Sequence, residues 1–209
     1  MPAIEMRLLG PFEIRGVAGQ QLSISAKKNR ALLAALALAP SQSLPRERMT
    51  GLLWSDRGDA QARSSLRQAL LGLRADLAGS EVAALHIDDD RASINLAHVG
   101  VDALEFRRLA ALDDVVALRR ANSLYRGELL ADTFVQDPAF QEWLGAERQR
   151  LADLASSVIE RLCAYESGAT RIDLAKRLVA IDQLRESIAP AFDAGLFRCG
   201  GTGPCAAAI

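Results

Sequence analysis

The sequence is poor in the residues that build metal sites and disulfide frameworks. Its 209 residues include only three cysteines and two histidines. Cys163, Cys199 and Cys205 show no C-x-x-C spacing, and His86 and His98 are isolated from one another. This pattern excludes a zinc site and a disulfide-rich secreted fold, and it predicts a reduced, cytoplasmic protein with no metal and no cofactor. We expect both histidines to be structural or solvent-exposed.

Sequence motifs of enzymes and of membrane proteins are also missing. The chain has no glycine-rich phosphate loop, no G-x-S-x-G and no H-E-x-x-H, so we predict that it is not an enzyme. Its longest apolar run, residues 31–40, is too short to cross a membrane. Residues 1–10 lack the apolar core of a signal peptide, and we expect no membrane partner.

Half of the residues are hydrophobic, yet only 5% are aromatic, and this composition favours helices. The net charge is −1, but it is unevenly distributed. Residues 27–74 contain nine basic and three acidic residues, whereas residues 99–209 contain 13 basic and 16 acidic residues. A basic segment joined to an acidic one is typical of a DNA-reading module attached to a protein-contacting module.

The most informative segment is residues 59–77, where apolar and basic residues follow a helical period. At about 100° per residue, one face carries Ala62, Leu66, Ala69, Leu70, Leu73 and Leu77. Arg63, Arg67 and Arg74 line up beside that face, followed by Ser64 and Gln68. Such a helix suits a DNA major groove, where arginine pairs with guanine and hydroxyl or amide groups reach other base edges. Taken alone, the pattern is equally typical of an amphipathic surface helix with solvated arginines.

The preceding segments favour the DNA-binding interpretation. Residues 6–24 alternate between apolar and polar around glycine and proline, which predicts short antiparallel strands. Helices are predicted over residues 26–39 and 45–54, where Ser25 suits an N-cap and Pro45 suits a first turn.

A hairpin with an Asp-rich turn is predicted over residues 85–96. Sheet, three helices and hairpin, in this order, predict a winged helix with an added N-terminal sheet, in which the third helix reads the groove. The hairpin is then the wing, and Arg91 near its tip is a candidate phosphate or minor-groove contact. Asp88, Asp89 and Asp90 oppose close approach of this turn to phosphate.

From residue 101 onward the pattern is helical. We expect Asp102 to cap one helix and Asp113 or Asp114 to open the next. Longer helices are predicted over residues 138–166 and 172–187. Paired helices of this kind suggest tetratricopeptide-like hairpins, which stack into a surface for other proteins. The predicted fold class is therefore mainly α with small β-sheets, a winged helix-turn-helix followed by an all-α domain.

Several spaced motifs together resemble the antibiotic-regulatory-protein (SARP) family of bacterial transcriptional activators. They are LLGPF (8–12), KKNRALLAALALA (27–39), LLW (52–54), ARSSLRQAL (62–70), LR (73–74), VD (101–102), LYRGELL (124–130), Trp143 with ER (147–148), and LRE (184–186). The resemblance covers roughly residues 6–188, and the combination is more specific than any single motif.

The resemblance implies an OmpR-type winged helix joined to a bacterial transcriptional activator domain of tetratricopeptide-like helices. It implies binding to promoter direct repeats on double-stranded DNA, as a homodimer, with recruitment of RNA polymerase. The recognition helix corresponds to residues 61–77. The segment turned toward polymerase corresponds to the loop at residues 54–60, with Ser55, Asp56, Arg57, Gly58 and Asp59.

The predicted domains are residues 1–98, residues 99–188 and a C-terminal tail, residues 189–209. The tail departs from the family, in which another helical pair follows the LRE motif. It is Gly-rich and lacks periodicity, so we expect it to be disordered or loosely packed. We interpret it as a frameshifted or degraded reading frame that leaves the helical domain incomplete.

Two functions remain open from the sequence. As a DNA-binding activator, the chain would contact base edges with Arg63, Ser64, Arg67 and Gln68. Phosphate contacts or their support would come from Arg74, Lys27, Lys28, Arg30, Arg46 and Arg48. Each of these could instead be a solvated charge, and Arg30 or Arg74 could form intradomain salt bridges. The alternative function is a DNA-inactive protein-interaction scaffold that uses the helical half.

Overall fold

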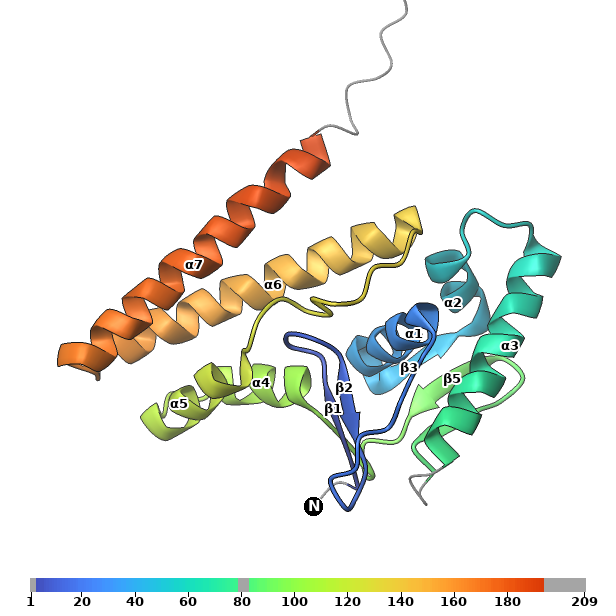
Figure 1. The fold of residues 1–209 in the computed structure, drawn as a ribbon, viewed down its shortest axis with the longest axis horizontal. Helices are drawn as coiled ribbons and strands as arrows, with labels where there is room; N and C mark the ends of the chain where they lie inside the picture. The colour runs from blue at the N-terminus through green and yellow to red at the C-terminus, as the bar shows by residue number, and fades with distance from the viewer. Residues whose placement is uncertain (1–2, 79–82, 194–209) are drawn as a thin grey trace, which may run out of the picture.

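The computed structural model describes residues 3–78 and 83–193, which form two adjoining lobes (Figure 1). The elements are β1 (Ile4–Arg7), β2 (Glu13–Arg15), α1 (Lys27–Leu38), a 3-10 turn (Pro40–Gln42), β3 (Ser43–Pro45), α2 (Arg46–Leu53), α3 (Asp59–Leu77), β4 (Leu85–Ile87), β5 (Arg91–Ile94), β6 (Val99–Val101), α4 (Asp102–Ala110), α5 (Val115–Leu124), α6 (Pro138–Cys163) and α7 (Gly168–Asp193). We call residues 3–101 the winged-helix lobe and residues 102–193 the helical lobe. The predicted fold class is confirmed.

The first sheet has the strand order β2-β1-β6 and joins distant parts of the sequence. β1 pairs antiparallel with β2, with Met6 opposite Ile14, and parallel with β6, with Ile4 opposite Val99. The side chains of Ile4 and Met6 are buried, as expected for alternate residues of a half-buried strand. Residues 22–24, predicted as a strand, form none. Leu22 donates only one backbone bond to Ile14.

The winged-helix lobe is built around α1, in which every residue from Ala31 to Leu38 is buried. α2 and α3 pack against it, and the second sheet, with order β3-β5-β4, closes the lobe. β4 and β5 form the predicted wing, and β3 adds a third strand with Leu44 opposite Ala92. Two helix starts differ from prediction. The N-cap of α1 is Ala26 rather than Ser25, and Pro45 is the N-cap of α2 because it still pairs within β3.

The helical lobe consists of consecutive helices that pack on one another, α4 on α5, α5 on α6 and α6 on α7. Asp114, rather than Asp113, caps α5 by accepting the N–H of Ala117 at 2.8 Å. α7 continues to Asp193, beyond the predicted end at residue 187, so the first residues of the predicted tail are helical. The remainder of that tail lies outside the described residues.

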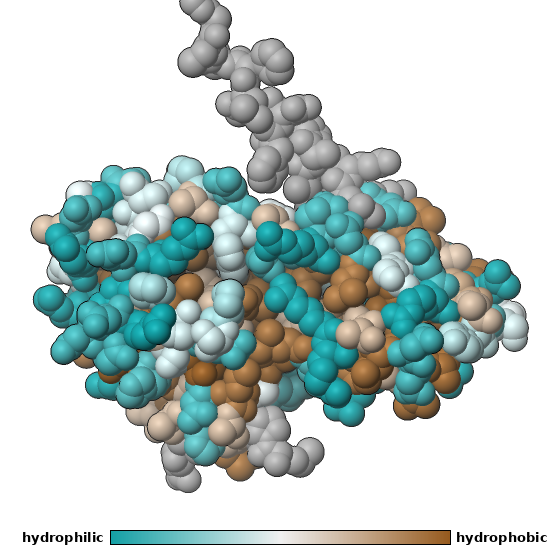
Figure 2. Space-filling view, turned by 180° about the vertical axis from the view of Figure 1, so that it is seen from behind, coloured by the Kyte–Doolittle hydropathy of each residue, from teal (hydrophilic) through white to brown (hydrophobic). Residues whose placement is uncertain are grey.

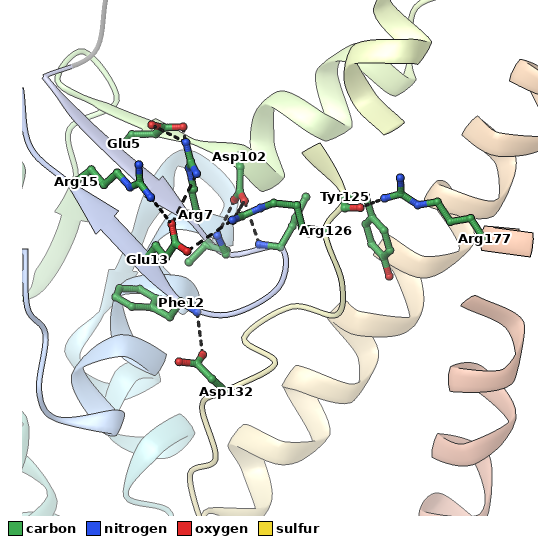
Figure 3. Close-up of polar contacts among 12 residues, drawn as sticks. Glu5, Arg7, Phe12, Glu13, Arg15, Asp102, Tyr125, Arg126, Asp132 and Arg177 are labelled. Carbon is green, nitrogen blue, oxygen red and sulfur yellow. Dashed lines mark hydrogen bonds and ion pairs between the residues drawn. The ribbon is translucent and has the colours of Figure 1, made fainter. Parts of the chain in front are cut away.

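A buried carboxylate, Asp102, joins the two lobes (Figure 3). It accepts the backbone N–H groups of Leu8 at 2.7 Å and Leu9 at 3.1 Å, and it lies 3.5 Å from Arg126. Burial raises the pKa of this carboxyl, and the N–H bonds and Arg126 oppose that shift. The prediction that Asp102 caps α4 is therefore wrong. Its side chain instead accepts the backbone N–H groups of Leu8 and Leu9, just after β1, and the N-cap residue of α4 is Val101.

A second carboxylate, Asp132, also connects the helical lobe to the winged-helix lobe. It accepts the backbone N–H of Phe12 at 2.8 Å and pairs with Arg30 at 3.3 Å. Because Asp102 and Asp132 both bind the segment after β1, the two lobes are held together by polar contacts as well as by apolar packing. In the described ranges, no helix is both long enough and apolar enough to cross a membrane.

Candidate nucleic-acid interface

α3 forms the outer edge of the winged-helix lobe (Figure 1). Its buried face is the predicted one, with Ala62, Leu66, Ala69, Leu70, Leu73 and Leu77. The helix begins after Gly58, with Asp59 in its first turn and Arg74 in its last turn. Both charges match the helix dipole, which favours anions at the N-terminus and cations at the C-terminus. The opposite face of α3 is left free for a partner.

The arginines of α3 are available for binding. Arg63, Arg67 and Arg74 are exposed, and none forms an ion pair or side-chain hydrogen bond with another described residue. Ser64 and Gln68 are exposed beside them. A guanidinium with all its donors free can bind a phosphate or the paired acceptors of guanine.

An open groove between α2 and α3 brings several predicted residues together. Its lining includes Arg46 of α2, Arg57 of the following loop, and Arg63 and Arg67 of α3. Three carboxylates, Glu47, Asp59 and Asp89, line the same groove. The groove is therefore of mixed charge, and α3 supplies its two cations, Arg63 and Arg67, that have no partner in the described part of the chain.

Arg46 and Arg30, both predicted near phosphates, form bonds within the chain. The Arg46 guanidinium donates to the carbonyl of Asp88 at 2.8 and 3.2 Å, which ties α2 to the wing. Arg30 donates to the carbonyl of Ile24 at 2.7 Å, in addition to its ion pair with Asp132. Arg46 thus holds α2 against the wing, and Arg30 holds α1 against the segment before it and against Asp132.

Lys28 is also engaged within the chain. Its ammonium donates to the carbonyl of Leu53 at 2.5 Å and lies 5.1 Å from the centroid of the Trp54 ring. Burial lowers the pKa of Lys28, and nearby Arg57 lowers it further. Lys28 thus holds the end of α2 against α1.

The wing tip carries Arg91 among carboxylates. The Asp88 carboxylate accepts the backbone N–H of Arg91 at 2.7 Å and that of Asp90 at 2.9 Å. These bonds lower the pKa of Asp88. The Arg91 side chain is exposed, and so are Asp89 and Asp90.

The loop between α2 and α3 is anchored to the helical lobe. Asp137, only 1% exposed, accepts both the backbone N–H of Ser55 at 3.0 Å and its hydroxyl at 2.9 Å. The same carboxylate caps α6. Arg57 donates to the hydroxyl of Ser65 at 2.9 Å, while Asp56, Gly58 and Asp59 are exposed.

Two other predicted cations lie apart from the α3 arginines. Lys27 is exposed at the first residue of α1. Arg48 lines a different groove, of about 990 Å³, between α2 and α6 and beside Leu52 and Trp143. Figure 2 shows hydrophobic residues between the two lobes on the rear face, whereas the winged-helix lobe is mostly hydrophilic on this face. In the part of the chain described, no cluster of His, Cys, Asp or Glu is placed to hold a metal ion.

One exposed residue of α3 was missed by the sequence reasoning. Leu71 is 54% exposed, although it belongs to a helix that buries its other leucines. The helical period already contained the signal, because about 100° per residue places Leu71 opposite the buried face.

The chain is similar to a solved structure of EmbR from Mycobacterium tuberculosis, which is in complex with a low-affinity phosphopeptide. The TM-score is 0.55 at 16% sequence identity. The alignment covers 94% of this chain and 61% of the EmbR chain, so this chain spans about three fifths of that protein's length. The shared fold is a winged helix followed by a helical domain. No protein-family model and no curated protein matches the sequence.

Proposed function

We propose that the chain is a sequence-specific DNA-binding transcription regulator that reads the major groove with α3. The observation that carries this proposal is the exposed face of α3, where Arg63, Arg67 and Arg74 have no internal partner in the described structure. Two further facts support it. The sequence motifs resemble the SARP family, and the fold is similar to that of EmbR from Mycobacterium tuberculosis.

Different residues have different roles in this proposal. Arg63, Ser64, Arg67 and Gln68 contact base edges near the N-terminal half of α3. Arg74 and the wing residue Arg91 contact phosphates, which orients the lobe without reading sequence. Lys28, Arg30 and Arg46 act indirectly, by holding α1, α2 and the wing in place.

The activator role involves two further partners. Two copies of the chain bind a direct repeat, with the half-sites about one helical turn apart so that both α3 helices face the same side of the duplex. The exposed loop residues Asp56 to Asp59 contact RNA polymerase. Asp137 supports this part of the proposal because it fixes the start of that loop.

Selection of binding sites from random duplex DNA with the full chain tests the function. We expect enrichment of a short sequence, present twice at a spacing of about one helical turn. The double variant Arg63→Ala/Arg67→Ala, which keeps the buried face of α3, should enrich no such sequence. A folded wild-type chain that enriches nothing contradicts the proposal and favours the protein-interaction scaffold.

A further inference from the structure

The centre of the exposed face of α3 is apolar in its C-terminal half. At about 100° per residue, Ser64, Gln68, Leu71 and Ala75 lie within about 60° of one another and opposite the buried face. Leu71 is 54% exposed, and Ala75 is exposed too. The arginines lie to one side of this row. The face therefore changes from hydrogen-bonding groups at Ser64 and Gln68 to apolar groups at Leu71 and Ala75.

Duplex DNA is the partner that fits this combination of groups. The arginines beside the row provide charge complementarity to a phosphate backbone. In the major groove, the apolar group available at a base edge is the C5-methyl of thymine, which an aliphatic side chain can contact. Leu71, exposed beside these arginines on the outward helix face, is not part of the apolar core of the described residues.

We propose that Leu71 contacts the C5-methyl group of thymine in the bound DNA, with Ala75 beside it on the apolar half of the face. This inference rests on the proposed function and adds the base that the C-terminal half of α3 recognises. Leu71 follows Arg67 by four residues, or about 6 Å along the helix axis. Because α3 lies along the groove in this proposal, the thymine is expected within a few base pairs of the base that Arg67 contacts, at about 3.4 Å per base pair.

Deoxyuridine substitution isolates the methyl group, because deoxyuridine differs from thymidine only by its absence. The probe is the duplex enriched by the full chain, with each thymine replaced singly and the affinity measured by fluorescence anisotropy. For the wild type we expect an affinity loss of about fourfold at one thymine in each half-site, the effect of one methyl group leaving an apolar contact. Leu71→Ala should bind the thymine and deoxyuridine duplexes equally.

Leu112→Ala is the matched control, because Leu112 is another exposed leucine but lies in the helical lobe. This variant should keep the fourfold difference. Two results would contradict the methyl contact while the proposed function stands. In one, replacing any thymine of the enriched duplex by deoxyuridine leaves the wild-type affinity unchanged. In the other, Leu71→Ala still binds the thymine duplex about fourfold more tightly than the deoxyuridine duplex. If no sequence is enriched at all, the proposed function fails, and this inference fails with it.

Discussion

At the scale of single residues, the cations of the winged-helix lobe divide into two groups by what they contact. Lys28 and Arg46 donate to main-chain carbonyls, so their charges stabilise the lobe. Arg63 and Arg67 contact no described acceptor. The first group should therefore affect folding when substituted, and the second should affect binding.

Arg67→Ala should lower affinity for the enriched duplex by about 5- to 150-fold, or about 1–3 kcal/mol for one bidentate base contact. Because Arg67 is exposed and has no partner among the described residues, the free energy of unfolding should change by less than about 0.5 kcal/mol. Anisotropy titration and urea denaturation measure the two quantities. Arg171→Ala removes an exposed arginine of α7 and should change neither. Unchanged affinity of Arg67→Ala for both enriched and random DNA would show that α3 is not the recognition helix.

Unlike Arg67→Ala, Lys28→Met should lower the stability of the fold and leave DNA affinity unchanged. The substitution keeps the apolar stem but removes the bond to Leu53 and the cation over Trp54, so the free energy of unfolding should fall by about 1–2 kcal/mol. DNA affinity of the folded variant should stay within twofold of the wild type, a threshold of about 0.4 kcal/mol. A large loss of affinity without loss of stability would instead place Lys28 on the DNA.

At the scale of elements, the contact between the α2–α3 loop and α6 depends on one side chain. Asp137→Ala should lower the free energy of unfolding by about 2–4 kcal/mol, because it removes the cap of α6 and leaves the Ser55 N–H without its acceptor. Amide hydrogen exchange in residues 55–59 should become faster in this variant. Urea denaturation and exchange mass spectrometry measure the two effects.

Asp114→Ala is the matched comparison, since Asp114 caps α5 by a single bond and forms no hydrogen bond or ion pair with the described residues of the winged-helix lobe. This variant should lower the free energy of unfolding by about 1 kcal/mol and leave amide hydrogen exchange in residues 55–59 unchanged. If Asp137→Ala and Asp114→Ala lower the free energy of unfolding equally, the bonds from Ser55 to Asp137 contribute nothing measurable to stability.

Elements with strong periodicity and strands of local hairpins were predictable from the sequence, and strands that pair only with distant strands were not. The apolar period of α3 is long enough to define both its face and its bounds. β3 and β6 have three residues each, as β2 and β4 do, but β3 and β6 form only because a distant strand pairs with them. The carboxylate of Asp102 was assigned to a helix cap because its acceptance of the Leu8 N–H depends on a contact 94 residues away.

The candidate interface was also predictable only in part, namely where it depends on the period of one helix. Exposure of Arg63 and Arg67 follows from the period of one helix, which the sequence contains. The partner of Arg46 is the carbonyl of Asp88, 42 residues later, and no local pattern indicates it. Local arguments thus identify which side chains point outward, while tertiary contacts decide which cations remain free.

At the scale of the whole molecule, the two lobes should unfold together. The contacts of Asp102, Asp132 and Asp137 cross between the lobes, and α2 packs on α6. In urea, Trp143→Phe leaves Trp54 as the reporter of the winged-helix lobe, and Trp54→Phe leaves Trp143 as the reporter of α6. Within each variant, the fluorescence and far-ultraviolet circular dichroism transitions should coincide. Separate midpoints would show that the lobes fold independently.

The parallel pairing of β1 with β6 has a consequence for the order in which the chain folds on the ribosome. β1 is the central strand of its sheet, but Ile4 meets Val99 only after the whole winged helix has been made. At about 5–20 residues per second, the intervening chain takes roughly 5–20 seconds to synthesise. During that time β1 has β2 on one side and an open hydrogen-bonding edge on the other, a condition that promotes pairing with other nascent chains. Of the described strands, β1 is made before the others and is among the last to be completed, and translation speed sets how long its edge stays exposed.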